Sequence, residues 1–372
     1  MDVLPNGVFP VRRGLGVRVL DLFSGIGGFS LGLERAGMET VAFCEIEAYP
    51  RKVLAKHWPD VPIYDDVRTL TKERLDKDGI GSVDVICGGF PCQDISIAGK
   101  NAGIEGEKSG LWKEFRRVID ETRPKYTIIE NVSALLGRGL NVLLSDLSKI
   151  GYDATWTTYD TKYFGKPQRR RRVYIVAFRD GIPANCDLFE TRQRDSTLCE
   201  QQMENIDKSF RWDYSEGRGD KHTFTFFTRQ RSNEFKETGL SGTLAKRDYK
   251  SFTDLVFQDS VLRRVTPEER MNLQGLPTQW MSGCGLTSQE EFLCNGMSVP
   301  VVRYIGGLLI KYDVELNAPD GASFFADGRY RYLCDWGLGS YIISGGTEYG
   351  SIFSIPWLET RSDYYRLGTC NN

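Results

Sequence analysis

Histidine is scarce in this chain, which has only His57 and His222 among its 372 residues. Hydrolysis by a serine–histidine–acid triad and catalysis at a histidine-ligated metal both need imidazoles, so this scarcity makes both classes unfavourable. The nine cysteines are an odd, scattered set, and no two are spaced as a CxxC pair. We therefore expect reduced thiols, no disulfide framework and no metal site.

Long apolar runs are also absent. No stretch approaches the roughly 18 uncharged apolar residues that a membrane helix requires. The N-terminal run MDVLPNGVFPVRRG lacks the apolar core of a signal peptide. These absences predict a soluble, cytoplasmic protein with no membrane partner. The formal net charge of −2 shows no global excess of positive charge, so a surface for nucleic acid must come from local clusters.

The remaining composition is that of ordinary folded domains, with 40% hydrophobic and 26% charged residues. At roughly 150 residues per domain, the length predicts two or three domains. Short β-rich runs alternate with amphipathic stretches over the first half of the chain, which predicts an α/β fold with a doubly wound, mostly parallel sheet. The expected strands are Val17–Phe23, Thr40–Glu45, Val83–Gly88, Tyr126–Glu130, Ala154–Tyr159 and Val173–Phe178. Helices are expected at Phe29–Ala36, ending at Gly37, and at Lys113–Thr122, ending before Pro124.

Changes in composition divide the chain into four parts. Residues 1–179 carry the alternating pattern, and residues 180–262 are polar, with mixed aromatic and basic side chains. Apolar helical periodicity returns in residues 263–311, which we expect to complete the first domain. Residues 312–372 are aromatic-rich and net acidic, and their role is not predicted. Their aromatic residues favour a small packed appendage or a lid on an apolar surface, with a poorly ordered tail as the alternative.

A glycine-rich turn follows the first expected strand. The run DLFSGIGG, which begins at Asp21, leads into a helix, and such a turn lets a ligand approach backbone amides. The next strand ends at Glu45, twenty residues after Gly25, where an acidic side chain can accept the ribose hydroxyls of an adenosine. A nicotinamide fingerprint requires a third glycine where this chain has Ser30. The residues favour an adenosine-containing cofactor without a pyrophosphate, although the glycines alone would also fit a tight turn in any α/β protein.

A cysteine follows the third of these strands. The segment Gly89–Gln93 places Cys92 in a loop at the carboxyl edge of the sheet, where ligands bind in open α/β folds. The next strand delivers Glu130 and Asn131 to the same edge. A thiolate beside a protonatable carboxyl can attack an electron-poor heterocycle and supply a proton to its ring nitrogen.

Four consecutive arginines precede the last of these strands, in QRRRRVYIV. The period-two alternation of a strand would place Gln168, Arg170 and Arg172 on one face and Arg169 and Arg171 on the other. The first face can meet the acidic site, where it would lower the pKa of a thiol and orient a carboxylate. The second face is either a solvated run of charge or a ridge that binds phosphates.

The motifs DLFSGIGG, GGFPCQ, ENV, QRRRRVYIV, RRVTPEERMNLQGLP and CNGMSVPVV occur in this order along the chain. Their order and spacing strongly resemble those of the DNA (cytosine-5) methyltransferases of bacterial or phage type, which use S-adenosylmethionine. The resemblance covers roughly residues 17 to 311. It implies a Rossmann-like methyltransferase fold in which residues 1–179 bind the cofactor and carry catalysis, and residues 180–262 recognise the target.

The resemblance also assigns roles to individual residues. The catalytic set would be the nucleophile Cys92, with Glu130 and Asn131 holding the target base and Arg170 and Arg172 supporting the base and the carboxylate. The cofactor pocket would be lined by Phe23, Gly25, Gly27, Glu45, Asp66, Val67, Pro91, Leu111 and Asn295. DNA would be contacted by Gln93, Ser96, Lys100, Arg229, Arg231, Lys246 and Arg247.

The activity implied by the resemblance is methylation of carbon 5 of a cytosine flipped out of double-stranded DNA, through a bond between Cys92 and carbon 6. Double-stranded DNA would be the partner of a monomeric protein in the cytoplasm, associated with the nucleoid. A cognate restriction endonuclease that forms no stable complex is left open. The recognition sequence does not follow from these residues.

One departure and three alternatives remain. Cys294 stands where the family usually has glycine, so its side chain either crowds the cofactor pocket or shifts the turn. An RNA cytosine methyltransferase on the same fold is less favoured, because a long variable segment suits a reader of duplex DNA. A catalytically silent binding module does not explain the intact Cys92 and Glu130. A nicotinamide oxidoreductase conflicts with Ser30.

Overall fold

A seven-stranded sheet forms the centre of the computed structural model, which describes residues 16–91, 111–183, 188–189, 224–228, 236–244, 254–258, 260–283, 292–316 and three further strands near the C-terminus. The strand order is β3-β2-β1-β4-β5-β7-β6. Every pair from β3 to β5 is parallel, and β7 runs antiparallel to both β5 and β6. The strands are β1 (Arg18–Leu22), β2 (Glu39–Cys44), β3 (Ile63–Tyr64), β4 (Val85–Gly88), β5 (Tyr126–Val132), β6 (Tyr152–Asp160) and β7 (Arg171–Arg179). The predicted doubly wound, mostly parallel sheet is confirmed, with β3 as an additional short edge strand.

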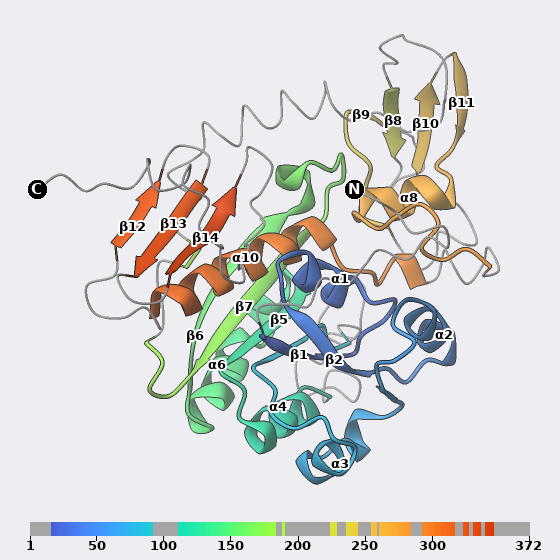
Figure 1. The fold of residues 1–372 in the computed structure, drawn as a ribbon. Coiled ribbons are helices and arrows are strands. Elements are labelled where there is room, and N and C mark those ends of the chain that lie inside the picture. The colour runs from blue at the N-terminus through green and yellow to red at the C-terminus, as the bar shows by residue number, and fades with distance from the viewer. Residues whose placement is uncertain are drawn as a thin grey trace, which may run out of the picture.

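Helices cover both faces of this sheet (Figure 1). On one face, Trp112 and Phe115 of α4 and Leu143 of α6 belong to the same buried cluster as Leu20 of β1. On the other face, α1 and α10 pack together against the sheet. The helical elements of this domain are α1 (Gly28–Arg35), α2 (Ala48–His57), η1 (Val67–Thr69), α3 (Lys72–Lys77), α4 (Leu111–Thr122), α5 (Leu135–Arg138), α6 (Leu140–Lys149), η3 (Thr161–Phe164) and α10 (Val299–Leu316).

The ends of the two predicted helices follow from local residues. Gly37, directly after the last turn of α1, has φ of 104°, a left-handed conformation that favours glycine. Helix α4 ends at Thr122, two residues before Pro124. The contact between α1 and α10 is close, because a Cβ on Gly32 would lie 2.6 Å from the side chain of Val302. Helix α10 therefore fastens the end of the first domain's sequence onto its beginning.

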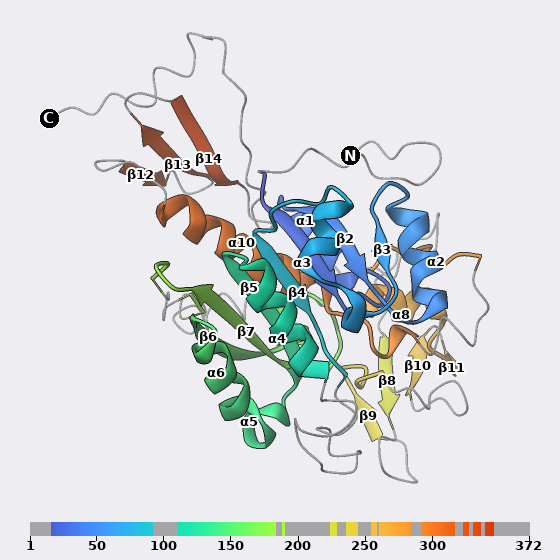
Figure 2. The same cartoon turned by 90° about the horizontal axis from the view of Figure 1, so that it is seen from below.

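A second, four-stranded antiparallel sheet lies beside the carboxyl edge of the first (Figure 2). A parallel bridge between Gln168 and Ser241 joins it to the residues that precede β7. The carboxylate of Asp254 supports this junction by accepting the N–H of Gly242 at 2.8 Å and the hydroxyl of Ser241 at 3.0 Å. The strands, with the helix that follows them, are β8 (Phe224–Thr228), β9 (Lys236–Thr238), β10 (Asp254–Gln258), β11 (Val261–Arg264) and α8 (Pro267–Leu273).

Two of the boundaries expected from composition fall inside secondary structure. The boundary between residues 262 and 263 lies within β11, and the one between 311 and 312 lies within α10, which runs on to Leu316. Composition changes mark where exposed sequence begins, but a helix can continue past its last buried residue. A three-stranded antiparallel sheet follows α10, at the end of the molecule away from β8–β11 in both views. Its strands are β12 (Ser323–Ala326), β13 (Tyr330–Asp335) and β14 (Gly339–Gly345).

Candidate active site

The turn between β1 and α1 is held by its own hydrogen bonds. The hydroxyl of Ser24 donates to the carbonyl of Asp21 at 2.6 Å, and the N–H of Gly27 donates to the carbonyl of Ser24 at 2.9 Å. Gly25 and Gly27 have φ of 53° and 84°, in the left-handed region. A Cβ on Gly27 would lie 2.5 Å from the ring of Trp58, whereas one on Gly25 would meet nothing within 4 Å. The turn is therefore packed on one side and open on the other.

Glu45, which directly follows β2, is hydrogen-bonded to this turn. Its carboxylate accepts the N–H of Gly25 at 2.7 Å and the N–H of Glu47 at 2.8 Å. Burial raises the pKa of this carboxyl. Because each oxygen accepts one backbone N–H and has a further lone pair, the carboxylate can still accept hydrogen bonds from ligand hydroxyls. The spacing of twenty residues between Gly25 and Glu45 corresponds to a direct hydrogen bond in the fold.

Ser30 has a structural role at the position where a nicotinamide fingerprint would have glycine. Its N–H and hydroxyl donate to Oδ2 of Asp21 at 3.2 and 2.7 Å. Asp21 is fully buried, and this burial raises the pKa of its carboxyl to about 7. The pair fixes the first turn of α1 to β1, which sets the direction in which the amides of the glycine turn point.

The other residues predicted for the cofactor pocket come from separate segments of the chain. Phe23 has φ of 55°, and its ring stacks on Phe115 of α4 with centroids 6.0 Å apart. Asp66 caps η1 and pairs with Arg68 at 2.7 Å, and the hydrogen bond from Arg68 lowers the pKa of Asp66. Val67 is buried in η1, Leu111 and Pro91 are half-buried, and Asn295 is exposed in the loop before α10.

Ile46 is a candidate residue that the sequence reasoning missed. It directly follows Glu45, and its apolar side chain is 60% exposed. An exposed apolar side chain beside a carboxylate that can bind ribose offers a surface for the flat ring of an adenine. The sequence feature that could have identified Ile46 is its position, as an apolar residue directly after the acid that ends the second expected strand.

Glu130 and Arg172 form an ion pair at the carboxyl end of β5. Arg172 Nε lies 3.1 Å from Glu130 Oε1, with the two side chains 15% and 10% exposed. A Cβ on Gly89 would lie 2.9 Å from Glu130 Oε2, so the carboxylate lies against the backbone that leads to Pro91. The site thus joins an acid, a fixed positive charge and the segment that precedes Cys92.

Asn131 also binds the segment that leads to Pro91. Its Nδ2 donates to the carbonyl of Phe90 at 3.1 Å, and its Oδ1 accepts the N–H of Val132 at 2.9 Å. The side chain is 2% exposed. Its amide therefore fixes the residue before Pro91, while its role in holding a target base stays a prediction.

The predicted alternation of the arginine run is confirmed, although β7 itself begins only at Arg171. Gln168 and Arg170 are buried and Arg172 is half-buried, while Arg169 and Arg171 are exposed. The guanidinium of Arg170 donates to the carbonyls of Cys294 and Gly296 at 3.3 and 2.7 Å. Burial lowers its pKa to about 10, so Arg170 stays charged at neutral pH and braces the loop that carries Asn295.

Cys294 does not crowd the open side of the glycine turn between β1 and α1. Its side chain is 6% exposed and belongs to the buried cluster that contains Trp58 and Trp280. Its thiol lies 3.7 Å from Oδ1 of Asn295. The side chain that replaces the usual glycine is therefore accommodated in the core behind the loop.

Eight of the predicted site residues lie outside the described residues, so the structure does not place them. They are Cys92, Gln93, Ser96, Lys100, Arg229, Arg231, Lys246 and Arg247.

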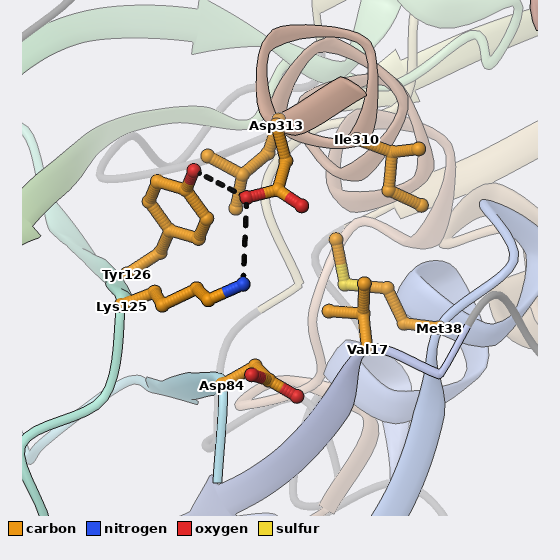
Figure 3. A pocket seen from close by; sticks show the side chains of 8 residues that line it. Val17, Met38, Asp84, Lys125, Tyr126, Ile310 and Asp313 are labelled. Carbon is orange, nitrogen blue, oxygen red and sulfur yellow. Dashed lines mark hydrogen bonds and ion pairs between the residues drawn. The ribbon is translucent and has the colours of Figure 1, made fainter. Parts of the chain in front are cut away.

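A hollow at the opposite edge of the sheet from Glu130 is lined mainly by apolar side chains (Figure 3). It is lined by the apolar side chains of Val17, Met38 and Ile310 and by a polar group around Asp313. Asp313 accepts the hydroxyl of Tyr126 at 2.7 Å and lies 3.9 Å from Lys125 Nζ. These contacts fasten the end of α10 to the start of β5, away from Glu130.

Within the ranges that the structure describes, no three or more His, Cys, Asp or Glu side chains gather as metal ligands. No helix in the same ranges is long and apolar enough to cross a membrane.

The fold and the site define an α/β protein in which a glycine turn with a buried acid and a carboxylate–arginine pair share one edge of the sheet. Residues 17–311 match the family model described as C-5 cytosine-specific DNA methylase. Because this match spans most of the chain, the protein belongs to that family. It is a DNA (cytosine-5) methyltransferase.

Relatives of known class agree with this assignment. The chain is 28% identical over 325 residues to the type II methyltransferase M1.ScrFI of Lactococcus lactis subsp. cremoris, covering 82% of this chain and 80% of that protein. It is 29% identical over 297 residues to M.NgoBI of Neisseria gonorrhoeae, covering 77% and 90%. The match to M2.BsuMI of Bacillus subtilis is 40% identical over 169 residues but spans only 42% of that protein.

Solved structures share the fold. The Schizosaccharomyces pombe Dnmt2 methyltransferase superposes with a TM-score of 0.55 at 20% identity, over 79% of this chain and 99% of that chain. The Entamoeba histolytica methyltransferase EhMeth gives a TM-score of 0.56 at 15% identity, over 81% and 98%.

Proposed function

We propose that this enzyme transfers the methyl group of S-adenosylmethionine to carbon 5 of a cytosine in a specific double-stranded DNA sequence, by base flipping and a transient bond to Cys92. The observation that supports this proposal most directly is that the cofactor turn and the Glu130 site converge on one side chain. Met297 Cβ lies 2.8 Å from the position of a Cβ on Gly28, and its Cε lies 3.6 Å from that of a Cβ on Gly89.

The donors and acceptors around the turn fit the adenosine half of S-adenosylmethionine. Glu45 retains lone pairs for the ribose hydroxyls, the space beside Gly25 is open, and Ile46 offers an apolar surface for the adenine. Phe23, Asp66, Val67, Leu111 and Asn295 would complete the pocket. When bound, S-adenosylmethionine supplies a methyl group made electrophilic by a positively charged sulfur.

The residues of the second site would activate the base. Carbon 5 of cytosine is a weak nucleophile, so we propose that the Cys92 thiolate first adds to carbon 6 while Glu130 donates a hydrogen bond or a proton to ring nitrogen 3. Arg172 holds Glu130 in place for this step. Carbon 5 then accepts the methyl group, and loss of its proton with departure of the cysteine restores the aromatic ring.

The target must leave the stacked duplex, because neither face of carbon 6 is accessible within it. We propose that residues 180–262 recognise the target and that the exposed Arg169 and Arg171 contact phosphates. The relatives include proteins named type II methyltransferases and one named an orphan methyltransferase of a Bacillus phage. Both an enzyme with a cognate restriction endonuclease and one without it are therefore compatible with the proposal. We further propose that the enzyme is monomeric and acts in the cytoplasm, at the nucleoid.

Trapping of the covalent bond tests this proposal. DNA in which cytosine is replaced by 5-fluorocytosine should form an irreversible adduct at Cys92, detectable as a modified peptide by mass spectrometry, because fluorine cannot leave as the carbon 5 proton does. Cys92→Ser should abolish both the adduct and methylation while cofactor binding persists. Full methylation by Cys92→Ala, or no adduct under turnover conditions, would contradict the mechanism. Sequencing host DNA for 5-methylcytosine, with and without expression, would identify the target.

A further inference from the structure

The segment after α8 reaches back to the cofactor turn. Trp280 is far from Ile26 in the sequence, yet its indole Nε1 donates to the carbonyl of Ile26 at 2.8 Å. The indole is buried, with 4% of the residue exposed. Because Ile26 lies between Gly25 and Gly27, this hydrogen bond acts on the centre of the turn that faces Glu45.

A second tryptophan supports the same turn from the end of α2. The ring of Trp58 occupies the space that a side chain on Gly27 would need, with its nearest atom 2.5 Å from that Cβ position. Trp58 and Trp280 pack edge to face with ring centroids 5.6 Å apart. The central residues of the cofactor turn are therefore held by two aromatic rings from distant parts of the chain.

The turn that carries Trp280 is itself fastened to α2. The ring of His57 stacks on Trp280 with centroids 3.5 Å apart and an interplanar angle of 5°, and its Nε2 lies 2.8 Å from the carbonyl of Trp280. Lys56 Nζ donates to the hydroxyl of Ser282 at 2.8 Å. These contacts fix the position of the indole N–H relative to the cofactor turn.

We propose that Trp280 is a positioning residue of the cofactor site: its indole N–H sets the Ile26 carbonyl and, through the rigid peptide planes, the direction of the neighbouring amides. The inference rests on the proposed function, since it takes the turn to bind S-adenosylmethionine. Trp280 lies behind the turn and acts on cofactor affinity, while the rate of the fully bound complex depends on Cys92 and Glu130.

Trp280→Phe tests this role, because it keeps an aromatic ring and removes the N–H. The dissociation constant of S-adenosylhomocysteine, measured by titration calorimetry, should rise about fivefold to tenfold, as expected for a lost hydrogen bond of ordinary strength. The KM for S-adenosylmethionine should rise by the same factor, and kcat at saturating cofactor should stay within about twofold of the wild type.

Tyr126→Phe is the matched control, since it removes a buried hydroxyl bonded to Asp313 at 2.7 Å at the opposite edge of the sheet. It should lower the melting temperature without changing the dissociation constant. His57→Ala is a milder second variant that removes the stacking partner of Trp280, and we expect it to raise the same constant by a smaller factor.

The outcomes separate the two proposals. No binding of S-adenosylhomocysteine by the wild-type protein would overturn the proposed function, and this inference with it. Wild-type binding with an unchanged constant in Trp280→Phe and His57→Ala would overturn the inference alone. An equal rise in the Tyr126→Phe control, or a fall in kcat with unchanged KM, would also overturn it, because the effect would then be general destabilisation or chemistry.

Discussion

Asp21 combines full burial with an ionisable carboxyl, which makes the stability of this fold depend on pH. Its pKa is raised from 3.8 to about 7 by burial, against the hydrogen bonds from Ser30 that favour the charged form. Between these two values the folded protein keeps a proton that the unfolded chain has released. Asp21 therefore adds stability below about pH 4 that is lost progressively as the pH rises to 7.

Asp21→Asn should remove this dependence, because an amide can accept the Ser30 N–H and cannot ionise. Relative to the variant, the wild type should lose on the order of 2 kcal/mol of unfolding free energy between pH 5 and pH 8. Urea denaturation at pH 5, 6.5 and 8 measures the difference. Ser30→Ala is the control, because it removes one donor at 2.7 Å but keeps the carboxyl. Its unfolding free energy should therefore still depend on pH. Parallel curves for wild type and Asp21→Asn would show that Asp21 does not titrate in this range.

Neighbouring arginines of β7 offer a second comparison at the residue scale. Arg172 pairs with Glu130 at 3.1 Å, whereas Arg171 is exposed and bonds to the hydroxyl of Thr158 at 2.9 Å. Arg172→Met should lower kcat by about a hundredfold or more, with the dissociation constant of S-adenosylhomocysteine unchanged. Arg171→Met should raise the KM for DNA and leave kcat near the wild-type value. Single-turnover and steady-state assays of both variants test whether Arg172 acts in catalysis and Arg171 in DNA binding. A fall in kcat in Arg171→Met, with only a higher KM for DNA in Arg172→Met, would contradict these roles.

Sequence patterns predicted which side chains are buried and which are exposed better than they predicted the contacts between distant residues. The alternation in QRRRR follows from the period of a strand, and the Gly25-to-Glu45 spacing follows from the length of a helix and the strand after it, so both could be recognised in the sequence. The contacts of Arg170 with the Cys294 and Gly296 carbonyls depend on where α10 packs. Such contacts join segments more than a hundred residues apart and leave no local pattern.

Among the elements, α8 begins with signals that the sequence carries openly. Thr266 and Glu269 form a reciprocal capping box with Pro267 at the first helical position, and Glu269 also pairs with Arg263 of β11 at 2.7 Å. Thr266→Ala should cost about 1 kcal/mol of unfolding free energy. Thr71→Ala, which removes the cap of α3 far from the four-stranded sheet, should cost a similar amount.

The two cap variants should differ in their effect on the KM for DNA. Because α8 joins the four-stranded sheet to the turn that carries Trp280, we expect Thr266→Ala to raise the KM for DNA as well, whereas Thr71→Ala should not. Chemical denaturation and steady-state kinetics on both variants measure this. Equal KM values would show that α8 contributes stability only.

Other elements escaped prediction for identifiable reasons. Strand β3 has two residues, too few to show alternation. Helix α2 runs unbroken from Ala48 to His57, but only Pro50, Val53 and Leu54 of it are buried, too few to show a clear apolar face. The antiparallel direction of β7 could not be predicted, because a buried strand reads as the same apolar run in either direction. The buried Val173–Phe178 core of that strand was identified from its composition alone.

For the whole molecule, the net charge of −2 conceals an uneven distribution of charge. The exposed Arg169 and Arg171 lie beside the Glu130 site, so DNA binding there should release counterions. We expect affinity for duplex DNA to fall about a hundredfold or more between roughly 50 and 200 mM salt. Fluorescence anisotropy across this range gives the slope, and Arg171→Met should reduce the slope by about one unit. A binding constant independent of salt would contradict a phosphate-contacting surface.

The limits of the catalytic fold can be tested from its C-terminal end. Helix α10 is buried as far as Ile310, and its last turn still contributes Tyr312, whose ring packs on Tyr126 and Phe178, and Asp313, which accepts the Tyr126 hydroxyl. Deleting residues 318–372 leaves all of these contacts, so kcat and the dissociation constant of S-adenosylhomocysteine should stay within about twofold of the full chain.

Deleting residues 312–372 removes those contacts as well and should lower the melting temperature by several degrees, because a buried hydroxyl and two aromatic contacts lose their partners. The comparison of the two truncations separates the last turn of α10 from the segment that follows it. If the shorter deletion alone abolished turnover while circular dichroism showed a folded core, the three-stranded sheet β12–β14 would belong to the catalytic machinery.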